Sequence, residues 1–198
     1  VLNFPGNPTG YTPTEAELRP WLDAIAQSDK PVVVLSDDAY AGFVYEPGRL
    51  PRSPFFELAT MDPERVLAIK IDGATKELVF FGARVGFITF GAEGEGARIL
   101  EDKLKGAARS SVSTAPAISQ AMVTAALAHP DLEQERQTLL NHVAARYRTL
   151  KQALAAHGLS AVPFNSGFFA MVPTPGDPEL LRQTLLAQGV GVISLQRH

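Results

Sequence analysis

The sequence contains no cysteine and only four histidines among its 198 residues. Without cysteine the chain cannot form disulfides, thiolate-bound zinc sites or a cysteine nucleophile. The histidines (His129, His142, His157 and His198) show none of the spacings typical of metal ligands, so we expect no metal site.

The chain also lacks an excess of basic residues and any long apolar run. Eighteen lysines and arginines stand against 21 acidic residues, which gives a net charge of −3, and the basic residues are scattered. Nucleic-acid binding usually requires a basic excess. A membrane span needs ~18 consecutive apolar residues, and no run approaches that length. We therefore expect a cytoplasmic protein with no nucleic-acid and no membrane partner.

Both ends of the sequence are apolar, which is unusual for a domain. The chain starts without methionine in an apolar run at 1–4 and stops just after another at 190–195. Domains usually begin and end in loose polar segments. We expect the chain to be a piece of a longer protein.

In the first half, short apolar runs alternate with helical patterns, which is typical of a parallel sheet covered by helices. We predict four strands, at 1–4, 31–36, 65–71 and 85–90, and an irregular connection over 41–63. Only about fourteen residues separate the last two strands, which is too few for a crossover helix. The fourth strand should therefore be antiparallel to its neighbour.

The first helix should begin at Thr14, because 14–17 form a capping box. We expect Leu18, Trp21, Leu22 and Ile25 to form its buried face.

After residue 93 the pattern becomes mainly helical. Helices are predicted at 93–108, 116–128, 131–157 and 177–188, with short strands near 160–163, 167–173 and 190–194. The fold class is therefore α/β, with a mostly parallel sheet followed by a smaller α+β lobe.

Polar residues follow three of the predicted strands at the point where each strand ends. Asn7 follows the first, 37–40 (Asp-Asp-Ala-Tyr) follows the second, and 72–76 (Asp-Gly-Ala-Thr-Lys) follows the third, with Arg84 eight residues later. Open α/β sheets bind ligands at this edge. Each residue alone has an ordinary explanation: Asn7 as a turn residue, Asp37 as a solvated acid or cap, and Lys76 as a surface lysine.

Together and in this order, these residues resemble the cofactor site of the class I/II aminotransferases, which are fold-type I enzymes dependent on pyridoxal 5'-phosphate. The resemblance covers almost the whole chain and continues at 165–169 (Asn-Ser-Gly-Phe-Phe). It implies that 1–115 is the carboxyl-terminal portion of the cofactor-binding large domain. Residues 116–198 would be the small domain, incomplete at its end.

The resemblance also implies a role for each site residue. Asp37 would keep the cofactor ring nitrogen protonated, because a buried carboxylate favours the charged form. Asn7 and Tyr40 would bind the phenolic oxygen of the ring. Arg84 would bind the phosphate as a two-pronged donor, with the Thr75 hydroxyl as a lesser contact.

Lys76 would form the Schiff base and move the α-proton of the substrate. Lys70 is the alternative, because alternation with its apolar neighbours gives it a strand face of its own. Lys76 is favoured because it follows small residues past the strand end, at the family spacing to Arg84.

The sequence departs from the family pattern at Gly73, where members often carry a serine that contacts the phosphate. The glycine-rich phosphate-binding turn would precede residue 1, and the arginine for the substrate α-carboxylate would follow residue 198. Arg109 has two interpretations: a residue that reaches toward the substrate side chain, or a cap on the preceding helix end.

We expect an amino-acid aminotransferase that acts on an amino acid and a 2-oxo acid, as a homodimer when intact. Two alternatives remain open: another reaction at the α-carbon, such as C–S lysis or decarboxylation, and an aminotransferase-like sensor domain of a transcriptional regulator. We predict that the 198-residue chain alone is inactive.

Overall fold

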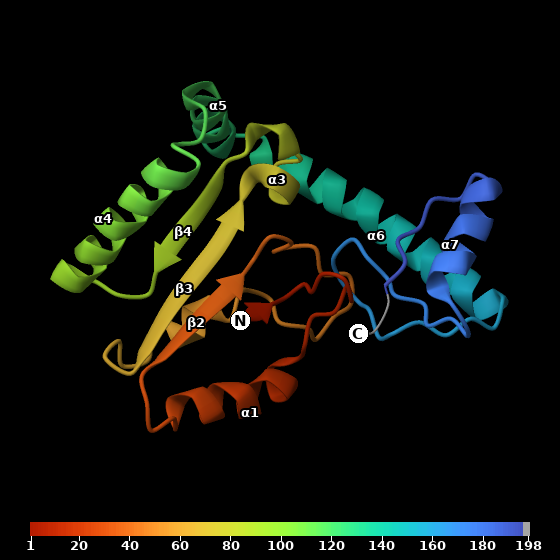
Figure 1. Cartoon of the computed structure of the whole chain (residues 1–198), viewed down its shortest axis with the longest axis horizontal. Helices are drawn as coiled ribbons and strands as arrows, with labels where there is room; N and C mark the ends of the chain where they lie inside the picture. Colours follow the sequence, from red (N-terminus) through yellow and green to blue (C-terminus); the bar gives the residue numbers. More distant parts are fainter. Residues whose placement is uncertain (196–198) are drawn as a thin grey trace.

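The computed structural model describes residues 1–195, and its centre is a single four-stranded sheet (Figure 1). The strands lie side by side in chain order: β1 (Leu2–Asn3), β2 (Val32–Asp37), β3 (Val66–Gly73) and β4 (Gly86–Phe90). The first three are parallel, and β4 runs antiparallel to β3. Both the four strands and the antiparallel fourth are as predicted.

Helix α1 (Glu15–Ala26) begins where the capping box predicts. The Thr14 side chain accepts a hydrogen bond from the Glu17 backbone, and the Glu17 carboxylate accepts one from the Thr14 backbone. Leu18 and Leu22 are buried, but Trp21 is 66% exposed, so its predicted place on the buried face was wrong. Leu18, Leu22 and Ile25 form the apolar stripe that packs on the core, and Trp21 lies outside this stripe on the helix surface.

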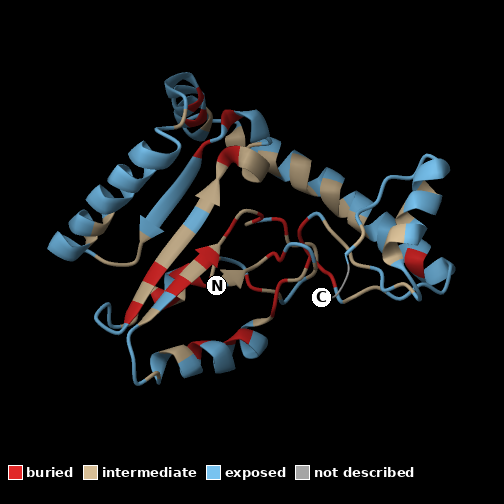
Figure 2. Ribbon diagram, viewed as in Figure 1, coloured by how far each residue is buried: buried red, intermediate tan, exposed pale blue. Residues whose placement is uncertain are grey.

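The main core lies between one face of the sheet and two helices, α1 and the short α2 (Phe55–Leu58). Helix α2 falls within the segment that we predicted to be irregular. Buried residues concentrate in this layer (Figure 2). The core comprises Leu18, Leu22, Val34, Leu50, Phe55, Leu58, Val66 and Ala68.

The opposite face of the sheet is apolar and largely uncovered. Val33, Ile71 and Ile88 lie on this face by register, and each is at least 38% exposed.

The other helices follow β3 in the chain. A short helix α3 (Ala74–Glu77) and a 3-10 turn η1 (Phe81–Ala83) connect β3 to β4. The four predicted helices appear close to their predicted bounds as α4 (Gly94–Ser111), α5 (Ala117–Leu127), α6 (Leu132–Ala156) and α7 (Pro178–Ala187). Helix α6 runs from the neighbourhood of α3 to that of α7 (Figure 1). No helix within 1–195 is both long and apolar enough to cross a bilayer.

The short strands predicted at 160–163, 167–173 and 190–194 do not form. The segment keeps a single β-bridge, between Val44 and Ser166, and one strand-like hydrogen bond from Val162 N to Met171 O at 2.8 Å. The apolar runs are there, but a strand also needs a neighbour to complete its hydrogen bonds. Two of these runs, 160–163 and 167–173, lie beside each other at that bond, but one hydrogen bond does not make a ladder.

The proposed division near residue 115 stays a prediction. Val123 of α5 packs with Ala74, Ala83 and Val85, which belong to the region around β3 and β4.

Candidate active site

Three strand ends meet around the side chain of Tyr40, which is 6% exposed. The Lys76 Nζ atom lies 5.6 Å from the centroid of the Tyr40 ring. Asp37 and Asn7 approach closely enough for their charge and hydrogen bonding to act on the pKa of Tyr40. The structure thus brings Asn7, Asp37, Tyr40 and Lys76 into one cluster, although they are spread over 70 residues of sequence.

Burial raises the pKa of the Tyr40 hydroxyl above its ordinary value, and the negative charge of Asp37 adds to the rise. A hydrogen bond with the Asn7 side chain acts in the opposite direction but does not cancel the shift. The hydroxyl therefore stays protonated at neutral pH and can donate a hydrogen bond to a ligand oxygen.

Asn3, at the end of β1, joins two parts of the cluster. Its Oδ1 atom accepts a hydrogen bond from Asn7 N at 2.7 Å, and its Nδ2 atom donates to the backbone oxygen of Asp37 at 3.2 Å. Asp37 is half-buried, and its Oδ1 accepts from Ala39 N at 3.2 Å. The sequence offered no signal for Asn3, because its role depends on pairing between β1 and β2.

Lys76 is positioned by the sharp transition from β3 into α3. A Cβ atom placed on Gly73 would lie 2.9 Å from the backbone oxygen of Val85. The same oxygen accepts a hydrogen bond from Ala74 N at 3.2 Å, and Ala74 is 1% exposed. This close approach explains glycine at position 73, because a serine there would push β4 away from β3.

The two candidate lysines differ in their surroundings. Lys70 forms ion pairs with Asp72 and with Asp38, the latter at 3.8 Å. Among residues 1–195, Lys76 forms no ion pair, and its Nζ atom faces the rings of Tyr40 and Phe168. An amine that acts as a nucleophile must be able to lose its proton, which paired carboxylates oppose. The geometry therefore favours Lys76 over Lys70.

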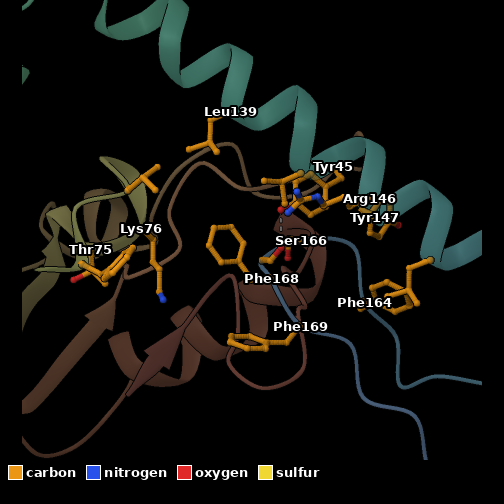
Figure 3. Close-up of a pocket in the computed structure, with 15 residues that line it drawn as sticks. Tyr45, Thr75, Lys76, Leu139, Arg146, Tyr147, Phe164, Ser166, Phe168 and Phe169 are labelled. Atoms are coloured by element: carbon orange, nitrogen blue, oxygen red, sulfur yellow. Dashed lines mark hydrogen bonds between the residues drawn. The ribbon is translucent and has the colours of Figure 1, made fainter. Parts of the chain in front are cut away.

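Lys76 lies in the wall of a cavity of about 450 Å³ between α3, α6 and 164–169 (Figure 3). This volume is within the range of small-molecule sites. Leu139 and Arg146 of α6 and Phe168 line it opposite Lys76. No pattern in the sequence indicated the α6 residues, and the only signal for Phe168 was the aromatic pair that follows Gly167.

The segment 164–169 is fastened to the amino-terminal turn. The Asn165 side chain accepts from Thr12 N at 2.9 Å and donates to Thr12 O at 3.0 Å, and both residues are buried. Gly167 N donates to Phe43 O at 2.8 Å, and the Tyr45 hydroxyl donates to Gly167 O at 2.6 Å. These bonds hold Phe168 against Tyr40, with ring centroids 5.3 Å apart.

The remaining predicted site residues, Thr75, Arg84 and Arg109, lie outside the cluster around Tyr40. Thr75 lines the cavity beside Lys76. Arg84 is exposed, adopts a left-handed conformation (φ 53°), and donates to Phe81 O at 3.1 Å. Arg109 is exposed in the last turn of α4 and donates to Ser113 Oγ at 3.3 Å. The phosphate role of Arg84 and the substrate role of Arg109 stay predictions.

The cluster fits the ring end of pyridoxal phosphate. Lys76 provides an amine free of ion pairs within the described chain, Asp37 a half-buried carboxylate, and Tyr40 a protonated hydroxyl beside Asn7. These are the donor types that the aldehyde, ring nitrogen and phenolic oxygen of the cofactor require.

The sheet, with a lysine just past β3 and polar residues at the ends of β1 and β2, has the architecture of an open α/β fold, a class in which ligands bind at the strand ends. A family model described as aminotransferase class I and II matches residues 1–197. The chain belongs to this family, whose members in general depend on pyridoxal phosphate.

Two relatives by sequence carry the same name. The chain is 26% identical over 179 residues to an LL-diaminopimelate aminotransferase of Bacteroides fragilis, which covers 88% of this chain and 42% of the relative. A protein of the same name from Phocaeicola vulgatus is 23% identical over 181 residues, or 89% of this chain and 42% of the relative. The chain therefore spans less than half the length of these curated relatives.

Solved structures share the fold. A Thermus thermophilus aspartate aminotransferase mutant superposes with a TM-score of 0.75 at 24% identity, over 97% of this chain and 50% of that one. The aromatic aminotransferase of Pyrococcus horikoshii gives a TM-score of 0.76 at 22% identity, over 93% and 47% respectively. These structures confirm the predicted fold class, and the family model confirms the family resemblance.

Proposed function

We propose that the protein of which this chain is part is an aminotransferase that moves an amino group from an amino acid to a 2-oxo acid. The observation that carries this proposal is the Lys76 amine, which is free of ion pairs within 1–195, faces Tyr40, and opens onto a cavity. The aminotransferase names of the relatives support it.

Pyridoxal phosphate is the cofactor in this proposal, and when bound it supplies an electron sink for the substrate α-carbon. Lys76 would hold the cofactor, and its Nζ atom would carry the proton that leaves the α-carbon. Asp37 would hold the ring nitrogen in its protonated form. Tyr40 and Asn7 would orient the ring through the phenolic oxygen.

The phosphate would be bound by Thr75 and Arg84. To do so, Arg84 would have to break its hydrogen bond with Phe81 O and turn. Its side chain can make this turn because it is exposed and has no second partner in the described residues. The aromatic rings of Tyr40 and Phe168 would limit access of water to the Lys76 amine. Arg109 would reach the substrate only if the intact assembly brings it there.

We further propose a cytoplasmic homodimer for the intact protein and no activity for the 198-residue chain alone. The uncovered apolar face of the sheet supports the second statement, because exposed Val33, Ile71 and Ile88 require a cover in a stable enzyme. Activity from the purified 198-residue chain would contradict it.

The test is the half-reaction of the full-length protein with single amino acids. Amino-group transfer requires that the amino acid convert the bound cofactor to its amine form, and that a 2-oxo acid convert it back. A lyase or decarboxylase would release its product without this cycle. Absorbance spectra of the bound cofactor distinguish the two, and the absence of the cycle with any common amino acid would reject transamination.

Lys76→Ala is the matching variant, and we expect it to abolish turnover. Borohydride reduction should attach the cofactor covalently to the wild-type protein and not to Lys76→Ala. Lys70→Ala serves as the comparison and should still be labelled. Labelling that survives in Lys76→Ala and disappears in Lys70→Ala would transfer the role to Lys70.

A further inference from the structure

A second charged cluster lies beside the candidate site and takes no part in the proposed reaction. We call it the strand-end clamp, and it consists of Lys70 and Asp72 of β3 with Asp38, which directly follows β2. Lys70 forms an ion pair with Asp72, and its Nζ atom lies 3.8 Å from Asp38 Oδ2. Asp38 is thereby linked to β3 through its side chain as well as through its backbone bond to Ile71 O at 2.8 Å.

The clamp is unusually deep for three charges. The side chain of Asp38 is 1% exposed, and those of Lys70 and Asp72 are 18% and 19% exposed. Asp38 Oδ2 has no hydrogen-bond partner among the described residues. Burial raises the pKa of Asp38, which the Ser53 side chain and the charge of Lys70 partly offset. Buried charges destabilise the folded state unless they are paired. Lys70 therefore offsets the cost of burying the Asp38 and Asp72 carboxylates.

The strand-end clamp lies on the opposite side of the strands from Asp37. Side chains alternate along a strand, so Ser36 and Asp38 share one face with Lys70, which is in register with Ser36, while Asp37 points to the other. The clamp thus connects the end of β2, which carries Asp37, to the end of β3, where Asp72 lies four residues before Lys76. It also lies close enough to Asp37 and Glu77 for their charges to act on Asp38.

We propose that Lys70 is a positioning residue for the cofactor site. Its ammonium group holds the ends of β2 and β3 in register, and this fixes the spacing between Asp37 and Lys76, which must bind opposite parts of one rigid ring. The proposal rests on the proposed function, because it assumes that Asp37 and Lys76 bind the same cofactor.

This role differs from simple stabilisation in a measurable way. Replacing a buried ion cluster by neutral groups of similar size is often neutral for stability, whereas removing one partner leaves uncompensated charge. A neutral version of the clamp can therefore keep the fold and still lose the electrostatic tie between the strands. A purely structural cluster would change cofactor affinity and stability together.

The experiment compares four variants of the full-length protein: Lys70→Met, Lys70→Arg, the neutral triple variant Lys70→Met/Asp38→Asn/Asp72→Asn, and Lys105→Met. The last removes an exposed lysine of α4 that also pairs with two acids, and it is the matched control. Titration of each apoprotein with pyridoxal phosphate gives the dissociation constant, and thermal unfolding of the apoprotein gives the melting temperature.

We expect the triple variant to unfold near the wild-type temperature and to bind the cofactor about tenfold more weakly, as happens when groups that orient a ligating residue are removed. Lys70→Arg should stay within about threefold of the wild type, and Lys105→Met should be unchanged. If Lys70→Met does not fold, the triple variant still decides the question. Wild-type affinity in the folded triple variant would overturn the proposal.

Failure of the proposed function gives a different result. A wild-type protein that does not bind pyridoxal phosphate, or that is labelled elsewhere than on Lys76 by borohydride, would reject that function before any clamp variant is compared. Conversely, Lys76 labelling in the wild type together with an unchanged triple variant rejects only the role of Lys70.

Discussion

The region around the sheet and the helical region after it are built differently. Residues 1–91 contain the main core, in which Leu22, Leu58 and Ala68 are at most 1% exposed. By contrast, α4 and α7 contain no buried residue, and α6 buries only Leu154 (Figure 2). The site residues come mainly from the first region. The second region contributes the segment 164–169, which is hydrogen-bonded to the first, and helix α6, which lines the cavity.

This difference separates two tasks. Rigid positioning of Asp37, Tyr40 and Lys76 requires a packed scaffold, which the sheet provides. Helix α6 contacts that scaffold through ion pairs and a ring contact. Arg136 pairs with Glu77 beside Lys76, and Lys151 pairs with Glu46 at 2.5 Å. The Tyr147 ring lies 5.0 Å from the Tyr45 ring. Polar attachments of this kind allow one region to move relative to another with little loss of packing.

The largest expected effect tests the difference in packing directly. Leu58→Ala should lower the free energy of unfolding by about 2–5 kcal/mol, because the side chain is fully buried between α2 and the sheet. Leu180→Ala on α7, where the side chain is 64% exposed, should change it by less than about 0.5 kcal/mol. Denaturant unfolding of the full-length protein measures both. Equal losses would mean that α7 is covered in the intact protein and that the contrast between the regions is limited to this chain.

A smaller effect is expected from a substitution at the junction between the regions, where Gly10 contacts the segment 165–169. Gly10 has φ +69°, and a Cβ atom there would lie 2.1 Å from Phe169 O and 2.9 Å from Ser166 O. Gly10→Ala should therefore push 165–169 off the amino-terminal turn and cost more than about 1 kcal/mol of stability. It should also weaken cofactor binding, because Phe168 and Tyr40 move apart.

Gly48→Ala is the matched control, since Gly48 has φ +76° with open space around its Cβ position. It carries the backbone penalty alone and should leave cofactor affinity unchanged. The same loss of affinity in both variants would assign the effect to general backbone strain.

The sequence predicted the scaffold far better than the junction. Short apolar runs and the capping box at Thr14 depend on residues close together in the chain, so they located β2, β3, β4 and α1 correctly. The antiparallel β4 followed from the length of one connection. The three strands predicted after residue 160 failed because a strand depends on a neighbour that local sequence does not specify.

The candidate site shows the same limit. The convergence of Asn7, Asp37, Tyr40 and Lys76 could be predicted because each lies at or just past the end of a strand, and parallel strands bring their carboxyl ends together. Asn3, Phe168 and Arg146 could not, because their positions depend on packing between segments far apart in the sequence. The sequence indicated Lys70 only as a rival to Lys76, since its buried partner Asp38 is brought to it by the pairing of β2 and β3.

The smallest expected effect concerns the attachment of α6 at Glu46. Burial alone would raise the pKa of Glu46, but hydrogen bonds from Lys151 and Tyr147 outweigh it and hold the pKa below its ordinary value of 4.5. A carboxylate whose pKa is lowered by folding stabilises the folded state above its ordinary pKa, and this contribution disappears as the pH falls through the folded value. Glu46→Gln should therefore cost less than about 1 kcal/mol at pH 7, because the pair is partly solvated. The difference from the wild type should shrink as the pH falls below 4.5 toward the lowered pKa of the folded state, and unfolding measured from pH 3 to 8 checks this. A difference that persists at low pH would assign the role of Glu46 to packing rather than charge, and α6 would then be attached as firmly as the elements of the sheet.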